Sequence, residues 1–489
     1  MIAKRRRRAA ALVLAACAVA AVAAAPATAP GEAATALYFA SIRNNPLLLL
    51  AFLADMPKGG DLHNHLSGAI YAESYLRWAA DDGLCLVTAT LSIVGGTCDA
   101  GGGRPPASEV VRNGDVYSRA IDAMSMRHWD PTQSGHDHFF ATFSHFGPAS
   151  AKTGDMLAEV AARAAAEHVS YLELMLTPDG GAGAARGAAA PWDPDFARQR
   201  DKLLAAGFRD AVISAARGRL DQAEARQREL LKCGAIQADG GCRVTLRYIY
   251  QVGRANTPQS VFGQMLAGFE IASSDPRLVS LNLVQPEDDP LAVHDFLLQM
   301  GMLDYLHGQY PNVKITLHAG ELVEGLVPPE ALRFHIRESV RLGHASRIGH
   351  GAGVIYEDDP LALLRELASK KVLVEIALSS NDLILGIRGS RHPLRTYLKY
   401  GVPVALVTDD PGVSRSSLTL EYRKAVEEHG LDYRTLKRMV RSSIEYSFAE
   451  AATKARLVTD LEAAFQAFEH RDRGQTRDQW PGTRVERPR

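Results

Sequence analysis

Eight short runs of apolar residues alternate with longer stretches whose apolar positions recur at helical spacing. A continuous apolar run bounded by polar residues is typical of a strand buried on both faces, the usual state in a parallel sheet. Eight strand–helix units predict an α/β fold, a TIM-type (β/α)8 barrel. An open doubly wound sheet is the alternative, but no Gly-x-Gly-x-x-Gly follows the first run. The predicted strands are residues 58–66, 169–177, 243–251, 278–284, 313–318, 347–350, 372–378 and 402–408.

The segments outside these units predict additions to the barrel domain, which we place at residues 56–470. Residues 31–55 form an N-terminal helical extension, and residues 83–147 form an insertion after the first strand that begins as a β-hairpin. The insertion also carries four phenylalanines at helical spacing, a pattern typical of packing or of a wall beside a ligand pocket. The Gly/Ala-rich residues 180–190 predict a loop, and residues 471–489 a polar tail.

The first thirty residues have the pattern of a secretory signal peptide: a positive start, an apolar stretch and then small residues. The stretch is too short and too Ala-rich for a membrane span. Cys17 follows a sequence like a lipoprotein box, but the residues after it stay apolar, which favours export to the periplasm or medium over a lipid anchor. In an oxidising compartment, four further cysteines predict two short disulfides. These are Cys85–Cys98 and Cys233–Cys242.

Composition narrows the class of protein. The chain of 489 residues is 46% apolar and 23% charged, typical of a soluble globular protein. Its formal net charge is -1, and no dense Lys/Arg patch follows residue 8. Nucleic-acid binding through the phosphate backbone is therefore not indicated.

Polar residues with catalytic or metal-binding chemistry stand at the ends of five predicted strands. In a barrel these ends meet on one rim, where active sites lie. Each group alone has an ordinary explanation, such as a helix cap or a tight turn, but together they predict an active site. The groups are His63-x-His65, His318-Ala-Gly-Glu321, Gly-His350-Gly, Ser-Asn381 and Asp409-Asp410-Pro.

Three imidazoles and one carboxylate suit a single Zn²⁺ ion and leave a position for water. The predicted ligands are His63, His65, His318 and Asp409. His350 is then free to orient or deprotonate the water, and Glu321 to donate a proton to the substrate. The fourth strand carries no Lys and no carboxylate before Glu287, so the site is predicted to hold one metal.

These motifs together resemble the adenosine deaminase family of metal-dependent amidohydrolases, over about residues 56 to 430. The leader and the cysteine pairs resemble its secreted, adenosine-deaminase-related branch. Cytidine-deaminase-type enzymes are excluded, because their His-x-Glu and Pro-Cys-x-x-Cys pattern is missing.

The resemblance implies zinc-dependent deamination of adenosine, and of 2′-deoxyadenosine, to the inosine product and ammonia. It implies that Glu321 protonates N1 of the purine, that His350 stabilises the attacking hydroxide and that Asp410 accepts a hydrogen bond near N7. Gln285 stands where the family usually has a glycine whose N–H meets N3. The alternatives are another aminopurine or modified nucleoside as substrate, or a nucleoside-binding protein in which catalysis is incidental.

Overall fold

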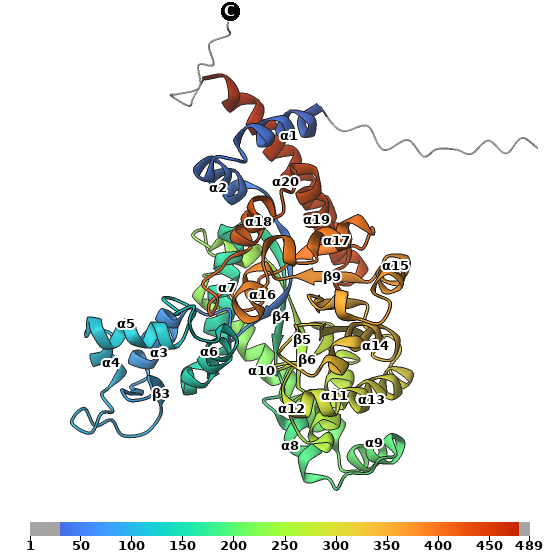
Figure 1. Cartoon of the computed structure of the whole chain (residues 1–489). Helices are drawn as coiled ribbons and strands as arrows, with labels where there is room; N and C mark the ends of the chain where they lie inside the picture. Colours follow the sequence, from blue (N-terminus) through green and yellow to red (C-terminus); the bar gives the residue numbers. More distant parts are fainter. Residues whose placement is uncertain (1–29, 479–489) are drawn as a thin grey trace, which may run out of the picture.

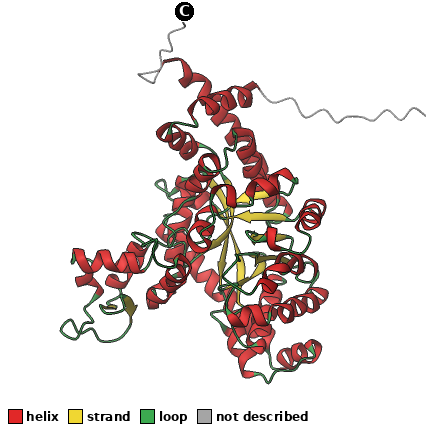
Figure 2. Cartoon of the chain, viewed as in Figure 1, coloured by secondary structure: helices red, strands yellow, loops and turns green. Residues whose placement is uncertain are grey.

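The centre of the computed structural model is one sheet of eight parallel strands, with helices around it (Figure 1, Figure 2). The described part of the chain is residues 30–478. The strands follow one another in sequence order, each paired in parallel with the next, which confirms the predicted TIM-type barrel. They are β1 Gly59–His65, β4 Val169–Leu176, β5 Thr245–Gly253, β6 Leu278–Val284, β7 Lys314–Ala319, β8 Arg347–His350, β9 Leu373–Ile376 and β10 Val404–Leu406.

The barrel closes where the last strand meets the first. A parallel bridge joins Asn64 of β1 to Asp409, just beyond β10. Here the Asp409 N–H donates to the His63 carbonyl and the His65 N–H donates to the Asp409 carbonyl, both at 2.9 Å. The closure therefore lies at the carboxyl ends of these two strands, on the rim where the predicted site residues stand.

Helices follow most strands and cover the outside of the sheet (Figure 2). Helix α15 begins at Pro360, because Asp359 caps the Ala362 N–H and Pro360 occupies the first turn. None of the helices in the described residues is both long and apolar enough to cross a membrane. The helices around the barrel are α7 Thr153–Ala166, α8 Ala182–Ala189, α9 Phe196–Ala205, α10 Phe208–Leu230, α11 Pro258–Ala272, α12 Pro290–His294, α13 Phe296–Gln309, α14 His335–Arg341, α15 Pro360–Lys370, α16 Leu378–Leu385, α17 Leu394–Lys399 and α18 Leu418–Glu427.

The two ends of the described chain pack together beside the barrel (Figure 1). Helices α1 Pro30–Ile42 and α2 Pro46–Asp55 lie against α19 Tyr433–Glu445 and α20 Ala451–Asp478. The rings of Phe52 and Phe468 meet edge to face with centroids 5.0 Å apart. Residues 1–29, with Cys17 and all but one residue of the predicted signal peptide, lie outside the described part, as do residues 479–489 of the predicted tail.

The insertion after the first barrel strand extends away from the sheet (Figure 1). After α3 Ala72–Asp81 it forms an antiparallel hairpin, β2 Cys85–Val87 and β3 Ser92–Val94, followed by α4 Ala107–Val110, α5 Gly114–Ala123 and α6 Gly135–Thr142. The Cys85–Cys98 disulfide ties this hairpin, and Cys233–Cys242 ties the segment between α10 and β5. Both are the predicted pairs.

Two local predictions were wrong. Residues 180–190, predicted as a loop, contain helix α8. It packs closely on α11, where a Cβ added at Gly187 would lie 2.9 Å from the Cα of Gly263, so small residues permit the contact. The predicted strand 372–378 ends at Ile376, and α16 begins at Leu378. Ser380 and Asn381 therefore lie on a helix directly after β9, still at the rim.

Candidate active site

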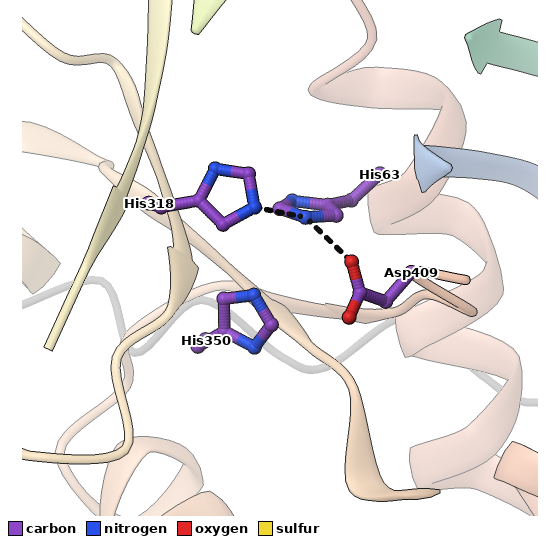
Figure 3. Close-up of side chains that lie close together, drawn as sticks. All are labelled: His63, His318, His350 and Asp409. Carbon is purple, nitrogen blue, oxygen red and sulfur yellow. Dashed lines mark hydrogen bonds and ion pairs between the residues drawn. The ribbon is translucent and has the colours of Figure 1, made fainter. Parts of the chain in front are cut away.

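The fold brings the predicted metal ligands and His350 together at the carboxyl ends of the strands. Figure 3 shows His63, His318, His350 and Asp409 converging from four elements. His63 and His65 lie on β1, His318 on β7, and His350 ends β8. All five side chains are buried or nearly so.

The four predicted ligand atoms have the spacing that a single metal requires. His318 Nε2 lies 3.0 Å from His63 Nε2 and 3.2 Å from His65 Nε2. Asp409 Oδ1 lies 3.3 Å from His63 Nε2 and 3.4 Å from His65 Nε2. Zinc held tetrahedrally at about 2.0–2.1 Å sets its donors roughly 3.3 Å apart. The donor set therefore fits Zn²⁺.

His350 also lies close enough to belong to a four-donor group with His63, His318 and Asp409. Its ring centroid is 5.1 Å from that of His63 and 5.2 Å from that of His318. His65, by contrast, makes direct Nε2 contacts to both His318 and Asp409. His350 Nε2 has no hydrogen-bond partner among the described residues, so the Nε2 contacts favour His65 as the fourth predicted ligand and leave His350 beside the group.

Three of the four predicted ligands are held from behind by a buried polar partner on another element. The carboxylate of Glu375 on β9 accepts from His63 Nδ1 at 2.8 Å, and the amide oxygen of Asn282 on β6 accepts from His318 Nδ1 at 2.9 Å. The Ser380 hydroxyl donates to Asp409 Oδ2 at 2.6 Å. Such partners fix the tautomer and the orientation of metal-binding imidazoles.

Glu375 is in turn paired with the buried Arg347, which also bonds to a second buried carboxylate, Glu173. Arg347 Nε donates to Glu375 Oε1 at 2.6 Å, and Arg347 Nη2 to Glu173 at 2.5 Å. The guanidinium also lies 3.7 Å from the centroid of the Phe448 ring. These contacts balance charges that would otherwise be costly to bury.

The titration properties of the ligands suit cation binding. Burial, then neighbouring imidazoles, hold the pKa of His318 well below its usual value, and burial lowers the pKa of His65 to about 3. Both rings thus offer lone pairs. Although burial opposes it, hydrogen bonds to Asp409 and Glu375 raise the pKa of His63 to about 10. Hydrogen bonds to two carboxylates thus give His63 surroundings that favour positive charge, which a bound cation would also supply.

Glu321 is oriented by a carboxylate that the sequence analysis did not assign. The Glu287 side chain accepts from the Gly320 N–H at 3.0 Å, from the Glu321 N–H at 2.7 Å and from His335 Nδ1 at 2.6 Å. The Glu321 carboxyl itself is buried, and its Oε1 has no hydrogen-bond partner in the described residues. Burial, with Asp409 and Glu287 nearby, raises the pKa of Glu321 well above its usual value, so this group can carry a proton to a substrate.

The site contains three non-glycine residues in the left-handed conformation, with φ of 79° at Gln285, 63° at His350 and 62° at Asp409. Such strain is typical of functional sites, where surrounding contacts impose it. At Gln285 the side-chain Oε1 accepts from the Ala255 N–H at 2.9 Å, which holds the carboxamide against the loop after β5. The predicted residue Gln285 is therefore at the site, with its side chain anchored.

One cavity of about 350 Å³ opens onto these groups. Its floor includes three of the predicted ligands (His65, His318 and Asp409) with Glu321 and Asp410, and one wall carries Gln285 with Pro286. Three phenylalanines of the insertion form another wall: Phe139, Phe140 and Phe143. Close packing beneath Asp410 requires Gly68, since an added Cβ there would overlap the carboxylate.

Sequence reasoning missed Glu375, Asn282 and Glu287, which lie behind the site. Glu375 is the one polar residue of the apolar strand β9, and Asn282 lies among the apolar residues of β6, which also holds Ser280. A buried polar side chain of this kind needs a partner, and that requirement is the signal that would have marked both.

Comparison with known proteins places this arrangement in a family. The profile named Adenosine deaminase matches residues 131–464. Aminodeoxyfutalosine deaminase of Streptomyces coelicolor is 27% identical over 373 residues, 73% of this chain and 82% of that protein. Adenine deaminase of Chelativorans sp. is 35% identical over 237 residues, 48% of this chain and 66% of that protein.

Among solved structures, an amidohydrolase from Burkholderia ambifaria with bound Zn has the same fold. Its TM-score is 0.53 at 16% identity, over 86% of this chain and 94% of that chain. With its barrel, its strand-end site and a profile match over most of its length, this chain is a hydrolytic deaminase and belongs to the adenosine deaminase family.

Proposed function

We propose that the protein is a zinc-dependent aminohydrolase that converts adenosine and 2′-deoxyadenosine to the corresponding inosine and ammonia. The observation that carries the proposal is a cluster of four predicted donors, in which His318 and Asp409 lie 3.0–3.4 Å from both His63 and His65. Three of these residues line one cavity together with the buried carboxyl of Glu321. The relative solved with bound Zn supports the choice of metal.

His63, His65, His318 and Asp409 would hold the ion, which when bound activates water for attack. The chain's own groups then direct the reaction. Glu321 donates its proton to N1 as the water oxygen adds to C6. The C6–N6 bond breaks and N6 leaves as ammonia. One of the two water protons leaves on ammonia. The other replaces the proton that Glu321 gave to N1, so the carboxyl is protonated again for the next cycle.

Gln285 and Asp410 would position the purine. Gln285 lines the cavity, and its backbone N–H makes no hydrogen bond within the described residues. Because the carboxamide is fastened to Ala255, the N–H remains available to N3 despite the larger side chain. Burial, then the charge of Asp409, raises the pKa of Asp410 well above its usual value. Oδ1 of Asp410 has no hydrogen-bond partner within the described residues. A protonated carboxyl there would donate a hydrogen bond to N7, which is an acceptor, and would not accept one as the resemblance implies.

The cavity favours an uncharged substrate. The described residues that line it include neither Lys nor Arg, so nothing there would neutralise a phosphate. The aromatic wall offers contact area for a base or for an apolar substituent. The alternative substrates are adenine, which the name of the Chelativorans relative gives, or a modified aminopurine nucleoside.

The test follows the ultraviolet band of adenosine mixed with the purified protein before and after chelation. We expect the band to shift to that of inosine, the shift to stop after chelation and to return with Zn²⁺. Adenine, 2′-deoxyadenosine and AMP are assayed alongside, with AMP expected to be the poorest. Faster turnover of adenine than of adenosine would change the assigned substrate but not the reaction. If the zinc-loaded protein binds adenosine but turns over none of these compounds, the enzyme assignment is contradicted.

Glu321→Gln separates proton donation from metal binding. It removes the acid and none of the ligands, so kcat should fall by about 10²–10⁴-fold while zinc content stays the same. Glu324→Gln, on the exposed loop beyond it, is the matched control and should keep full activity. Near-normal turnover of Glu321→Gln would remove the proton-donor role.

Export is the second part of the proposal. The two disulfides support folding in an oxidising compartment. Mass spectrometry of the protein from its native cells should show a chain lacking the leader and no lipid on Cys17. Four free thiols in a full-length cytosolic chain would contradict it.

A further inference from the structure

Three buried side chains form a hydrogen-bonded series that ends at the active site. His392, in the turn before α17, lies 3.1 Å through its Nε2 from Oδ1 of Asn381 on α16. Nδ2 of Asn381 lies 3.0 Å from Nδ1 of His350. All three are at most 4% exposed. His392 contributes nothing to the cavity wall, so it acts only through Asn381.

The outer end of the series determines the direction of every bond in it. The Leu394 backbone N–H donates to His392 Nδ1 at 3.2 Å, and a backbone N–H can only donate. Burial lowers the pKa of His392 to about 3, so the ring is neutral and its single proton lies on Nε2. That N–H donates to the Asn381 oxygen, and the Asn381 NH₂ group must then face His350.

At His350 the consequence is a defined tautomer. The Asn381 NH₂ donates to Nδ1, so the proton of the neutral His350 ring lies on Nε2. Nε2 is buried and has no partner within the described residues, while Nδ1 is the nitrogen that also lies 3.4 Å from Glu321 Oε1. In Figure 3 one ring nitrogen of His350 is turned toward His318 and His63.

We infer that His392 is a positioning residue that, through Asn381, keeps the proton of His350 on Nε2. His350 therefore donates a hydrogen bond to the attacking water oxygen and does not remove its proton. The role of His350 toward the attacking water rests on the proposed function. The position of its proton does not depend on that function, because it is a property of the protein without substrate.

The direct test is ¹⁵N NMR of histidine-labelled, zinc-loaded protein without substrate, with His350 assigned by its loss in His350→Gln. We expect an N–H signal at His350 Nε2 and an unprotonated Nδ1. Asn381→Asp replaces the donor by an acceptor of the same shape, so the proton should move to Nδ1. A wrong tautomer should lower kcat by at least 100-fold with KM and zinc content little changed.

Variants at the outer end test the relay without altering the cavity. His392→Phe removes the donor to Asn381 and should lower kcat by about tenfold, whereas His392→Gln restores a donor and should recover most of it. His429→Phe is the matched control, since that ring lies 5.7 Å from the His392 ring without a bond to Asn381. An Nδ1 proton on His350 in the parent protein, or parent kcat for both His392→Phe and Asn381→Asp, would overturn the inference. If Asn381→Asp does not fold, the spectrum of the parent protein decides.

Discussion

The floor of the cavity and its aromatic wall are built in opposite ways. On the floor, His318 and Asp409, and His63 beneath them, each hydrogen-bond to a buried polar group on another element. The wall comes from one insertion and presents phenylalanine rings to the cavity. One side-chain tie from this insertion to the barrel loops is His136, whose Nε2 lies 3.0 Å from Asp288 after β6.

This difference teaches where the protein tolerates change. Removing one of these polar side chains leaves its buried partner without a hydrogen bond. This costs stability and also disturbs the groups bonded to that partner. Removing an aromatic side chain from the wall loses contact area but leaves no unpaired charge. Substitutions on the floor should therefore affect chemistry and metal, and substitutions on the wall should affect affinity.

The largest effect is expected on the floor itself. His318→Ala deletes one of the four predicted ligands. The variant should lose its zinc, and its kcat should fall by at least 10³-fold. Metal analysis and turnover on the same sample measure both. His307→Ala, on the outer face of α13, is the control and should retain zinc. A zinc-containing, active His318→Ala protein would mean that His350 completes the ligand set in its place.

A smaller effect is expected one layer behind the ligands. Glu375→Gln removes the charge that His63 and Arg347 share, and loss of such a partner typically weakens metal binding by about 10–100-fold. Competition with a chromophoric chelator measures the affinity. Glu366→Gln, on the surface of α15, should bind zinc normally. An unchanged zinc affinity for Glu375→Gln would show that Glu375 does not support the metal site.

The wall should respond in KM. Phe143→Ala removes one ring from the cavity lining, and we expect KM to rise about tenfold with kcat within threefold, as for the loss of one aromatic contact. Phe196→Ala, on α9 away from the cavity, controls for general loss of stability. A fall in kcat with unchanged KM would contradict the separation of floor and wall.

The smallest effect is expected at the tie between wall and barrel. Hydrogen bonds to Asp288 and Asp137, against some burial, raise the pKa of His136, so the charged tie is complete below the ordinary histidine pKa of about 6.5 and weakens as the pH rises through the raised value. His136→Gln should raise KM by up to about fivefold at pH 6 and less at pH 9. Equal effects at both pH values would show that charge is irrelevant to this contact.

Much of the fold was predictable because parallel strands buried on both faces are continuous apolar runs, and the rim residues follow from the strand ends. Helix α8 could not be predicted in this way, because Gly183 and Gly187 have poor helix propensity. Their lack of side chains allows α11 to pack closely on this helix. Tertiary contact, which a local pattern does not record, decides that segment.

The same limit applies to the site. His63 and Asp409 belong to motifs that stand out along the chain, whereas Glu375 acquires its role only by meeting His63, 312 residues away. His392 is a further step removed, since its role depends on Asn381 and on one backbone N–H. Motifs identify groups that touch the reacting atoms, and the contacts that orient those groups appear only in three dimensions.

The bridge between Asn64 and Asp409 has a consequence for how the molecule is made. The first and last parts of the barrel meet there, and the same few residues supply His63, His65 and Asp409. A growing chain has no complete site until residue 409 has been synthesised and has returned to β1. In the folded protein the contacts that close the barrel are thus also the contacts that bring Asp409 to His63 and His65, so losing this closure would separate the predicted ligands.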